Sequence, residues 1–297
     1  MTQPFTGLLA YPITPLTHDG EPGLGALATL VRNAARAGVA GTTVLATSGA
    51  GVTFDRAERR AVVEAAVEAA REGEAAGETM LVNVAVSAAS TREVVHLAKD
   101  AQQAGADGLL LAPFAYLPLS DREVRTLFVA VAESSTLPVC FYNKPLQTQY
   151  DVLPDTLVFL AENANVVAVK ETMRRDNAAG RVRQLRDSVG AAFSIGLSAD
   201  VQLLAELPAV DAWHSGLAAL LPQDYAKVWR EAPSGSAPGP ELDRLQTLAR
   251  KLSQLPHAIG ALHALAECLG VPTSGPRGPF AAATEEEAAT LRQAIGL

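Results

Sequence analysis

The chain has 297 residues, of which 48% are hydrophobic, and its formal net charge is −8. This length and apolar content can build a large folded core, which argues against a disordered chain. The acidic balance, without any cluster of Lys and Arg, argues against nucleic acid as a partner, because nucleic-acid binding needs a basic patch.

Short apolar runs alternate with longer amphipathic stretches along most of the chain. The apolar runs predict strands at residues 7–11, 41–46, 80–86, 108–112, 139–142, 166–169, 192–195 and 212–215. The amphipathic stretches predict helices at residues 24–37, 55–72, 91–104, 120–133, 153–161, 178–188 and 199–206. Strands that alternate with helices favour a parallel sheet, and this length favours its closure into an α/β fold of the (β/α)8 TIM-barrel type. An open doubly wound sheet is the alternative.

The C-terminal part of the chain has a different pattern. Residues 231–240 are rich in Pro, Gly and Ser and predict a loop. Helical patterns follow at residues 241–255, 256–269 and 284–295. We therefore expect the barrel to span residues 1–230 and a C-terminal helical extension, packed on the barrel, to span residues 231–297.

The cysteines, histidines and apolar runs bear on whether the protein binds a metal and where in the cell it is found. Cys140 and Cys268 form no metal or redox motif, and the five histidines lack metal-ligand spacing such as His-Glu-x-x-His. We therefore expect no metal site. The first residues lack the basic and apolar regions of a signal peptide, and no uncharged apolar run reaches spanning length. A cytoplasmic protein without a membrane partner is expected.

The most informative segment is the run Val-Val-Ala-Val at residues 166–169, which leads directly into Lys170. Such a run is typical of a strand buried on both faces. Desolvation at the end of that strand disfavours an ammonium, and a neutral amine can attack a ketone to form a Schiff base. The alternative is a lysine that extends to water or guards the strand end.

A hydroxyl-rich loop follows the expected second strand. Thr47, Ser48 and Gly49 offer two hydroxyls and close backbone N–H groups, which suit a small anion such as a carboxylate. The alternative is a flexible turn. Neither the Gly-Lys-Ser/Thr ending nor the G-x-G-x-x-G order is present, so we expect no nucleotide cofactor.

Two further side chains could move protons. Tyr142 ends the expected fifth strand, where its phenol could act as a proton shuttle or could be a core tyrosine bonded to backbone. His214 ends the expected eighth strand and could be a general acid or base, or a satisfied core histidine.

Together these positions resemble the dihydrodipicolinate synthase / N-acetylneuraminate lyase family of Schiff-base aldolases. The segments that carry the resemblance are Gly7 to Pro15, Ala46-Thr47-Ser48-Gly49, Gly105-Ala106-Asp107 with Pro113, Leu137 to Asn143, and Val167-Ala168-Val169-Lys170-Glu171. Each motif is short, but their order and spacing together are specific.

The resemblance implies a role for each matching position. Lys170 would condense with the ketone of pyruvate or a related 2-oxo acid, Tyr142 would be the proton shuttle, and no cofactor would be needed. Thr47 and Ser48 would hold the substrate carboxylate. A homo-oligomer, tetramer or dimer, is also implied. The substrate-binding residues expected on these grounds are Thr47, Ser48, Gly49, Tyr116, Gln147, Gly196, His214 and Ser215.

The departures from the family pattern concern the second substrate, which we expect to be an aldehyde. The family's loop glutamate is Ala50 here, and Ala115 replaces the second tyrosine of its Pro-Tyr-Tyr segment, beside Tyr116. Gln147 stands where dihydrodipicolinate synthases carry an arginine, and a neutral glutamine cannot grip a carboxylate bidentately. His214 replaces a small or aliphatic residue.

These observations favour a class I lyase that acts on a 2-oxo acid by aldol cleavage or condensation, or by dehydration of a 2-keto-3-deoxy sugar acid. Three alternatives stay open: a dihydrodipicolinate (4-hydroxy-tetrahydrodipicolinate) synthase, a non-catalytic metabolite-binding paralogue, and an open-sheet nucleotide-binding protein.

Overall fold

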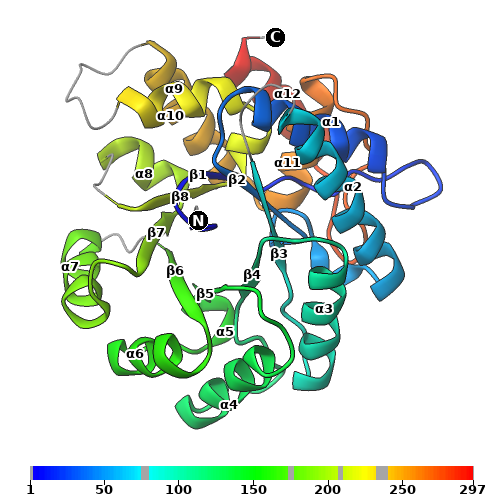
Figure 1. Cartoon of the computed structure of the whole chain (residues 1–297). Coiled ribbons are helices and arrows are strands. Elements are labelled where there is room, and N and C mark those ends of the chain that lie inside the picture. Colours follow the sequence, from blue (N-terminus) through cyan, green and yellow to red (C-terminus); the bar gives the residue numbers. More distant parts are fainter. Residues whose placement is uncertain (1–2, 75–79, 173–176, 207–209, 232–239, 297) are drawn as a thin grey trace.

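The computed structural model describes residues 3–74, 80–172, 177–206, 210–231 and 240–296. Within these residues, eight parallel strands close into a barrel in chain order, and β1 pairs with both β2 and β8 (Figure 1). The strands are β1 (Gly7–Ala10), β2 (Gly41–Val44), β3 (Leu81–Ala85), β4 (Gly108–Leu111), β5 (Val139–Asn143), β6 (Val166–Thr172), β7 (Ser194–Ser198) and β8 (Ala212–Ser215). The expected (β/α)8 barrel is confirmed, and the open doubly wound alternative is wrong.

The helices lie outside the ring of strands (Figure 1). Those of the barrel are α1 (Leu24–Arg36), α2 (Arg56–Glu74), α3 (Thr91–Gln103), α4 (Asp121–Ala132), α5 (Pro145–Thr148), α6 (Pro154–Asn163), α7 (Ala178–Val189), α8 (Asp200–Glu206) and α9 (Pro222–Glu231). Two 3-10 turns, η1 (Gly51–Thr53) and η2 (Leu217–Ala219), follow β2 and β8. The sequence patterns provide no range for α5, which has only four residues, or for α9.

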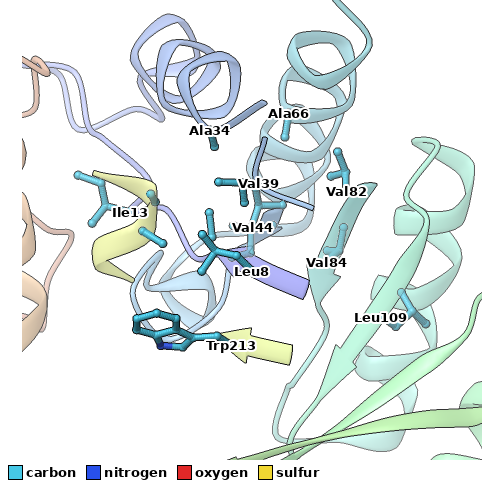
Figure 2. Close-up of a cluster of buried hydrophobic side chains, with 14 of the residues drawn as sticks. Leu8, Ile13, Ala34, Val39, Val44, Ala66, Val82, Val84, Leu109 and Trp213 are labelled. Carbon is cyan, nitrogen blue, oxygen red and sulfur yellow. The ribbon is translucent and has the colours of Figure 1, made fainter. Parts of the chain in front are cut away.

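Side chains alternate between two buried regions along each strand, because both faces of a parallel barrel are covered. On the outer face, strand residues pack against alanines of the helices, which lets the helices approach closely (Figure 2). The residues labelled there are Leu8, Ile13, Ala34, Val39, Val44, Ala66, Val82, Val84, Leu109 and Trp213. The inner region is smaller and contains Leu9, Tyr11, Cys140, Tyr142 and Ala168.

Most strands end within one or two residues of the prediction, and β6 and β7 differ most. β6 continues to Thr172, so Lys170 lies within the strand instead of after it, and β7 starts and ends later than expected. The register pairs Tyr142 with Lys170, and Lys170 with Gly196. Ladder hydrogen bonds to both neighbours therefore extend β6 past its apolar run, and hydropathy alone cannot reveal such an extension.

The C-terminal helices are α10 (Pro240–Gln254), α11 (Ala258–Cys268) and α12 (Glu285–Ile295), close to the expected ranges. The helix α10 packs against α8 and α9. The expected loop at 231–240 lies largely outside the described residues, and the division of the chain after residue 230 stays a prediction. No helix in the described part of the chain is both long and apolar enough to cross a membrane.

Candidate active site

Lys170 lies inside the barrel with its amine between two aromatic side chains. Its Nζ atom is 3.6 Å from the ring centroid of Tyr11 and 4.1 Å from that of Tyr142, and the residue is only 5% exposed. Burial, and then the nearby charge of Lys144, lower the pKa of Lys170 from 10.5 to about 7. A large fraction of this amine is therefore unprotonated near neutral pH, as a nucleophile requires.

Tyr11 and His214 fill one side of the barrel interior next to Lys170. The Tyr11 hydroxyl lies 2.7 Å from Nδ1 of His214. Burial raises the pKa of Tyr11, while burial and the charge of Lys170 lower the pKa of His214 well below its ordinary value. A protonated phenol can therefore donate to a neutral imidazole. His214 occupies space left by Gly196, where an added Cβ would overlap Nε2 of the imidazole.

The Thr47–Gly49 loop has a constrained backbone. Leu45 (φ 60°) and Ala50 (φ 48°), on either side of it, both adopt left-handed conformations. The Ser48 hydroxyl donates to the carbonyl of Tyr11 at 2.8 Å, so its proton is already used within the chain. Among the described residues, the amides of Ser48 and Gly49 have no backbone or side-chain acceptor, which leaves both available to a small anion.

Lys144 is a second amine near the site, and the sequence patterns did not single it out. Its Nζ atom lies 3.2 Å from the Thr47 hydroxyl and 5.6 Å from the ring centroid of Tyr142. Burial lowers the pKa of Lys144. Burial also raises the pKa of Tyr142 to about 12, although hydrogen bonding with Thr47 opposes part of that rise. Tyr142 therefore keeps its proton at neutral pH.

A cavity of about 280 Å³ opens beside Tyr142 and Lys144. Small residues at the ends of β2, β3 and β4 leave this space, and Ile259 and Phe280 of the C-terminal extension close one side of it. The described lining residues are Leu45, Ala46, Thr47, Ala50, Gly51, Val52, Ala85, Ser87, Leu110, Ala112, Phe114, Tyr142, Lys144, Gln147, Thr148, Ile259 and Phe280. The wall is mostly apolar and includes a few polar residues.

A buried hydrogen bond and an ion pair, both to Glu171, hold the ends of β5 and β6 in place. Asn143 donates to Glu171 at 2.9 Å, and Glu171 pairs with Arg181 of α7 at 2.8 Å. Because Tyr142 and Lys170 directly precede Asn143 and Glu171, these contacts fix the two strand ends that carry the candidate catalytic side chains.

One known family matches nearly the whole chain. The model of the dihydrodipicolinate synthetase family matches residues 4–296.

The chain belongs to the dihydrodipicolinate synthetase family.

Relatives across this family cover nearly the full chain. The chain is 31% identical to a 4-hydroxy-tetrahydrodipicolinate synthase of Streptomyces coelicolor, with 99% of this chain and 94% of the relative covered. It is 30% identical to a probable 2-dehydro-3-deoxy-D-pentonate aldolase of Escherichia coli, covering 90% and 88%. The crystal structure of a dihydrodipicolinate synthase from Agrobacterium tumefaciens superposes with a TM-score of 0.89 at 33% identity, covering 98% and 97%.

In this family member, the expected site residues fall into two groups. Lys170, Tyr142, Gly196 and His214 lie together inside the barrel, while Thr47 and Gln147 line the cavity. Ser48 and Gly49 follow Thr47 in the same loop but are not among the described lining residues.

Two expected residues are placed elsewhere. Tyr116 is 92% exposed and is not among the described cavity-lining residues. Ser215 is buried on β8 next to His214, and its Oγ accepts a hydrogen bond from the amide of Ala218. Successive strand residues point to opposite faces, so Ser215 lies on the helix-facing side of β8.

Asp200, at the start of α8, is a buried carboxyl that the sequence patterns missed. Burial raises its pKa to about 6, and Ser215, Trp213 and the amine of Lys170 oppose part of that rise. In return, the Asp200 charge favours the protonated form of Lys170. Within the described residues, no group of three or more His, Cys, Asp or Glu is arranged to hold a metal ion.

Proposed function

We propose that this family member is a class I lyase in which Lys170 forms a Schiff base with pyruvate or a related 2-oxo acid. The observation that carries the proposal is the buried amine of Lys170, held between two tyrosine rings with its pKa lowered to about 7. The relatives named as a synthase and as an aldolase support this class of chemistry.

The reaction would begin when the neutral amine of Lys170 adds to the ketone carbon. The resulting carbinolamine loses water, and a protonated imine remains. Tyr142, which keeps its proton at neutral pH, can give that proton to the departing hydroxyl and later recover it. The amides of Ser48 and Gly49 would hold the carboxylate and so orient the ketone toward Lys170.

The protonated imine then acts as an electron sink. Loss of a proton from the adjacent carbon gives an enamine, which can add to an aldehyde carbon and form a carbon–carbon bond. The reverse sequence cleaves that bond. In a 2-keto-3-deoxy acid the enamine can instead expel the hydroxyl of the next carbon, which takes up the proton removed from the adjacent carbon and leaves as water. The aromatic faces of Tyr11 and Tyr142 would stabilise the cationic nitrogen through all of these steps.

Borohydride trapping tests the proposal. The protein is incubated with pyruvate, treated with borohydride and weighed intact. We expect one reduced pyruvyl adduct per chain in the unchanged protein and none in Lys170→Ala, while the exposed control Lys99→Ala is trapped normally. No adduct with any 2-oxo acid, or an adduct that persists in Lys170→Ala, would contradict it. Thermal stabilisation by pyruvate without an adduct would favour a non-catalytic paralogue.

A second candidate is 4-hydroxy-tetrahydrodipicolinate synthesis, because the Streptomyces coelicolor relative carries that name. Gln147 speaks against the mode of binding expected of such a synthase, since it lacks the charge of the arginine that those synthases carry at this position. Turnover of pyruvate with aspartate semialdehyde at a rate typical of enzymes would establish this activity and overturn our interpretation of Gln147.

We also propose that the protein is a cytoplasmic homo-oligomer, a tetramer or a dimer. Large apolar side chains are exposed on the surface, notably Tyr116, Leu117 (69% exposed) and Leu146 (89% exposed). Exposed apolar groups of this size often mark a contact with another chain. Light scattering coupled to size-exclusion chromatography measures the assembly, and a monomer at micromolar concentration would contradict the proposal.

A further inference from the structure

We infer that Lys144 recognises a carboxylate on the second substrate, so that the preferred aldehyde has a compact apolar body ending in one carboxylate. This inference rests on the proposed function and concerns the same site. It assigns anion recognition to a residue other than Gln147, at the opening of the cavity beside Tyr142.

The first argument is the missing counter-ion of Lys144. Among the described residues, its amine contacts only the Thr47 hydroxyl and the Tyr142 ring, which are both neutral. No described carboxylate forms an ion pair with it, in contrast to Lys227, which pairs with Glu241 at 2.8 Å. A partly buried ammonium whose described contacts are all neutral is less stable than a paired one, and an anion supplied by a ligand would provide the missing counter-ion.

The second argument is the composition of the cavity wall. Lys144 is the one charged residue among the described lining residues, and most of the others are apolar. Some of the polar groups are already used, because the Thr148 hydroxyl contacts the carbonyls of Lys144 and Tyr150. A polyhydroxylated sugar acid would leave several buried hydroxyls without partners, which is unfavourable. An apolar body fits this wall better.

The third argument is that the carboxylate of the 2-oxo acid and the carboxylate of the aldehyde would bind at different places. The 2-oxo acid bound at Lys170 can place its own carboxylate on the amides of Ser48 and Gly49. Neither these residues nor Lys170 line the cavity, whereas Lys144 does. The Tyr142 ring lies next to both amines. A 2-oxo acid bound to Lys170 could therefore react with an aldehyde whose carboxylate is held by Lys144.

One cation favours a carboxylate over a phosphate. A phosphate carries a second charge and more acceptor oxygens, and the described wall offers no second cation for them. Gln147 can add a neutral hydrogen bond at the same opening of the cavity.

The test compares acidic and neutral aldehydes on the pyruvate-loaded enzyme. The probes are succinic semialdehyde, its methyl ester and butanal, with a phosphorylated aldehyde as a fourth. The enzymes are the unchanged protein, Lys144→Met, Lys144→Arg and the surface control Lys99→Met. The kcat/KM for the aldehyde is measured together with the trapped pyruvate adduct, so that an effect on Lys170 is separated from an effect on the aldehyde. Thermal melting checks the folding of each variant.

We expect the unchanged enzyme to prefer the acid over its neutral counterparts by about 10–100-fold, the worth of a charge-assisted hydrogen bond. At saturating pyruvate, Lys144→Met should lose this preference, because kcat/KM for the acid falls relative to kcat/KM for the methyl ester and for butanal. Lys144→Arg should keep much of the preference, and Lys99→Met all of it.

Four outcomes would overturn the inference. The unchanged enzyme could show no preference for the acid, or Lys144→Met could slow acidic and neutral aldehydes equally. The variant could instead raise only the pyruvate concentration needed for trapping, or the phosphorylated aldehyde could be the best substrate. A wild-type enzyme with no pyruvate adduct would contradict the proposed function itself, which is a separate result.

Discussion

The reactivity of Lys170 depends on neighbours that act in opposite directions. Burial and the charge of Lys144 disfavour its ammonium, while the charge of Asp200 and the faces of the Tyr11 and Tyr142 rings favour a cation at the same nitrogen. The amine can thus be neutral when it attacks and yet be stabilised once it has become a protonated imine.

Imine formation should therefore depend on pH in a defined direction. The pKa of Lys170 is lowered from 10.5 to about 7, so the reactive neutral form dominates above that value. We expect the rate of adduct formation to fall about tenfold per pH unit below pH 7 and to level off above it. Rapid-quench borohydride trapping measures this rate.

Lys144→Met should move the midpoint of the same profile to higher pH, because it removes a repelling charge. Lys99→Met should leave the midpoint unchanged. A flat profile, or a midpoint near that of an ordinary lysine, would contradict the assignment.

Tyr11 should contribute separately through its hydroxyl and its ring. Tyr11→Phe leaves Nδ1 of His214 buried without a partner, which should destabilise the fold by about 1–3 kcal/mol while adduct formation persists. Tyr11→Leu also removes the ring beside Lys170, and we expect a lower adduct yield at limiting pyruvate. Chemical denaturation and trapping measure the two effects. Tyr116→Phe, at an exposed position, should change neither, and equal trapping by Tyr11→Phe and Tyr11→Leu would exclude a role for the ring.

The sequence predicted only part of this group of residues. Lys170 and the Thr47–Gly49 loop were found because each ends a contiguous pattern. Tyr11 and Lys144 were not found, because their roles depend on contacts across the barrel: Tyr11 with His214, and Lys144 with Thr47. No local pattern distinguishes such residues from an ordinary strand tyrosine or a surface lysine.

Among the elements, the turn after β2 is the most constrained. Arg59 of α2 is buried and donates to the carbonyls of Gly51 and Ala85, which ties the turn to the end of β3. Gly51 has no room for a side chain, because a Cβ would overlap the carbonyl of Leu45. The geometry of the Thr47–Gly49 loop therefore depends on a glycine outside it.

Gly51→Ala should displace this loop, since the overlapping atom belongs to the backbone and cannot move alone. We expect a loss of several kcal/mol of stability and a large increase in the pyruvate concentration needed for trapping. Gly25→Ala in α1 is the matched control, because nothing lies within 4 Å of its added Cβ, and it should be neutral or slightly stabilising. Unchanged pyruvate affinity in a folded Gly51→Ala protein would show that the loop does not hold the carboxylate.

The prediction of elements succeeded where a strand or helix is set by its own residues. The ranges of α3 and α4 agree because both begin at a serine cap that the chain itself supplies. The ends of β6 and β7 disagree because polar residues there are held by the neighbouring strands.

For the whole molecule, the buried amine should lower stability. In the folded protein Lys170 has a pKa of about 7, against 10.5 in water, so folding opposes its protonation between these values. Lys170→Met should raise stability at neutral pH by about 0.5–2 kcal/mol while abolishing the adduct, as a trade between stability and function. Differential scanning calorimetry near pH 7 should show a higher Tm, and the gain should shrink as the pH rises toward 10. Lys99→Met should not change the Tm, and a lower Tm for Lys170→Met would contradict the prediction.

The shape of the cavity also depends on residues of the C-terminal extension. Ile259 and Phe280 reach it from the C-terminal extension, and Ser274 and Thr273 bond to the backbone of Leu16 after β1. Composition and length could predict that an extension exists. They could not predict which of its residues meet the barrel opening, because that depends on how the helices pack.

The alanines at one side of the barrel have a consequence for how new specificities could arise. Ala46, Ala85 and Ala112 line the cavity, whereas Tyr11 and His214, next to the reactive amine, are not among its described lining residues. A mutation that enlarges one of these alanines reshapes the space for a substrate without replacing any of the groups that activate Lys170. Related sequences could therefore diverge in the molecules they accept by single, independent steps, and a library randomised at these three positions would explore that diversity directly.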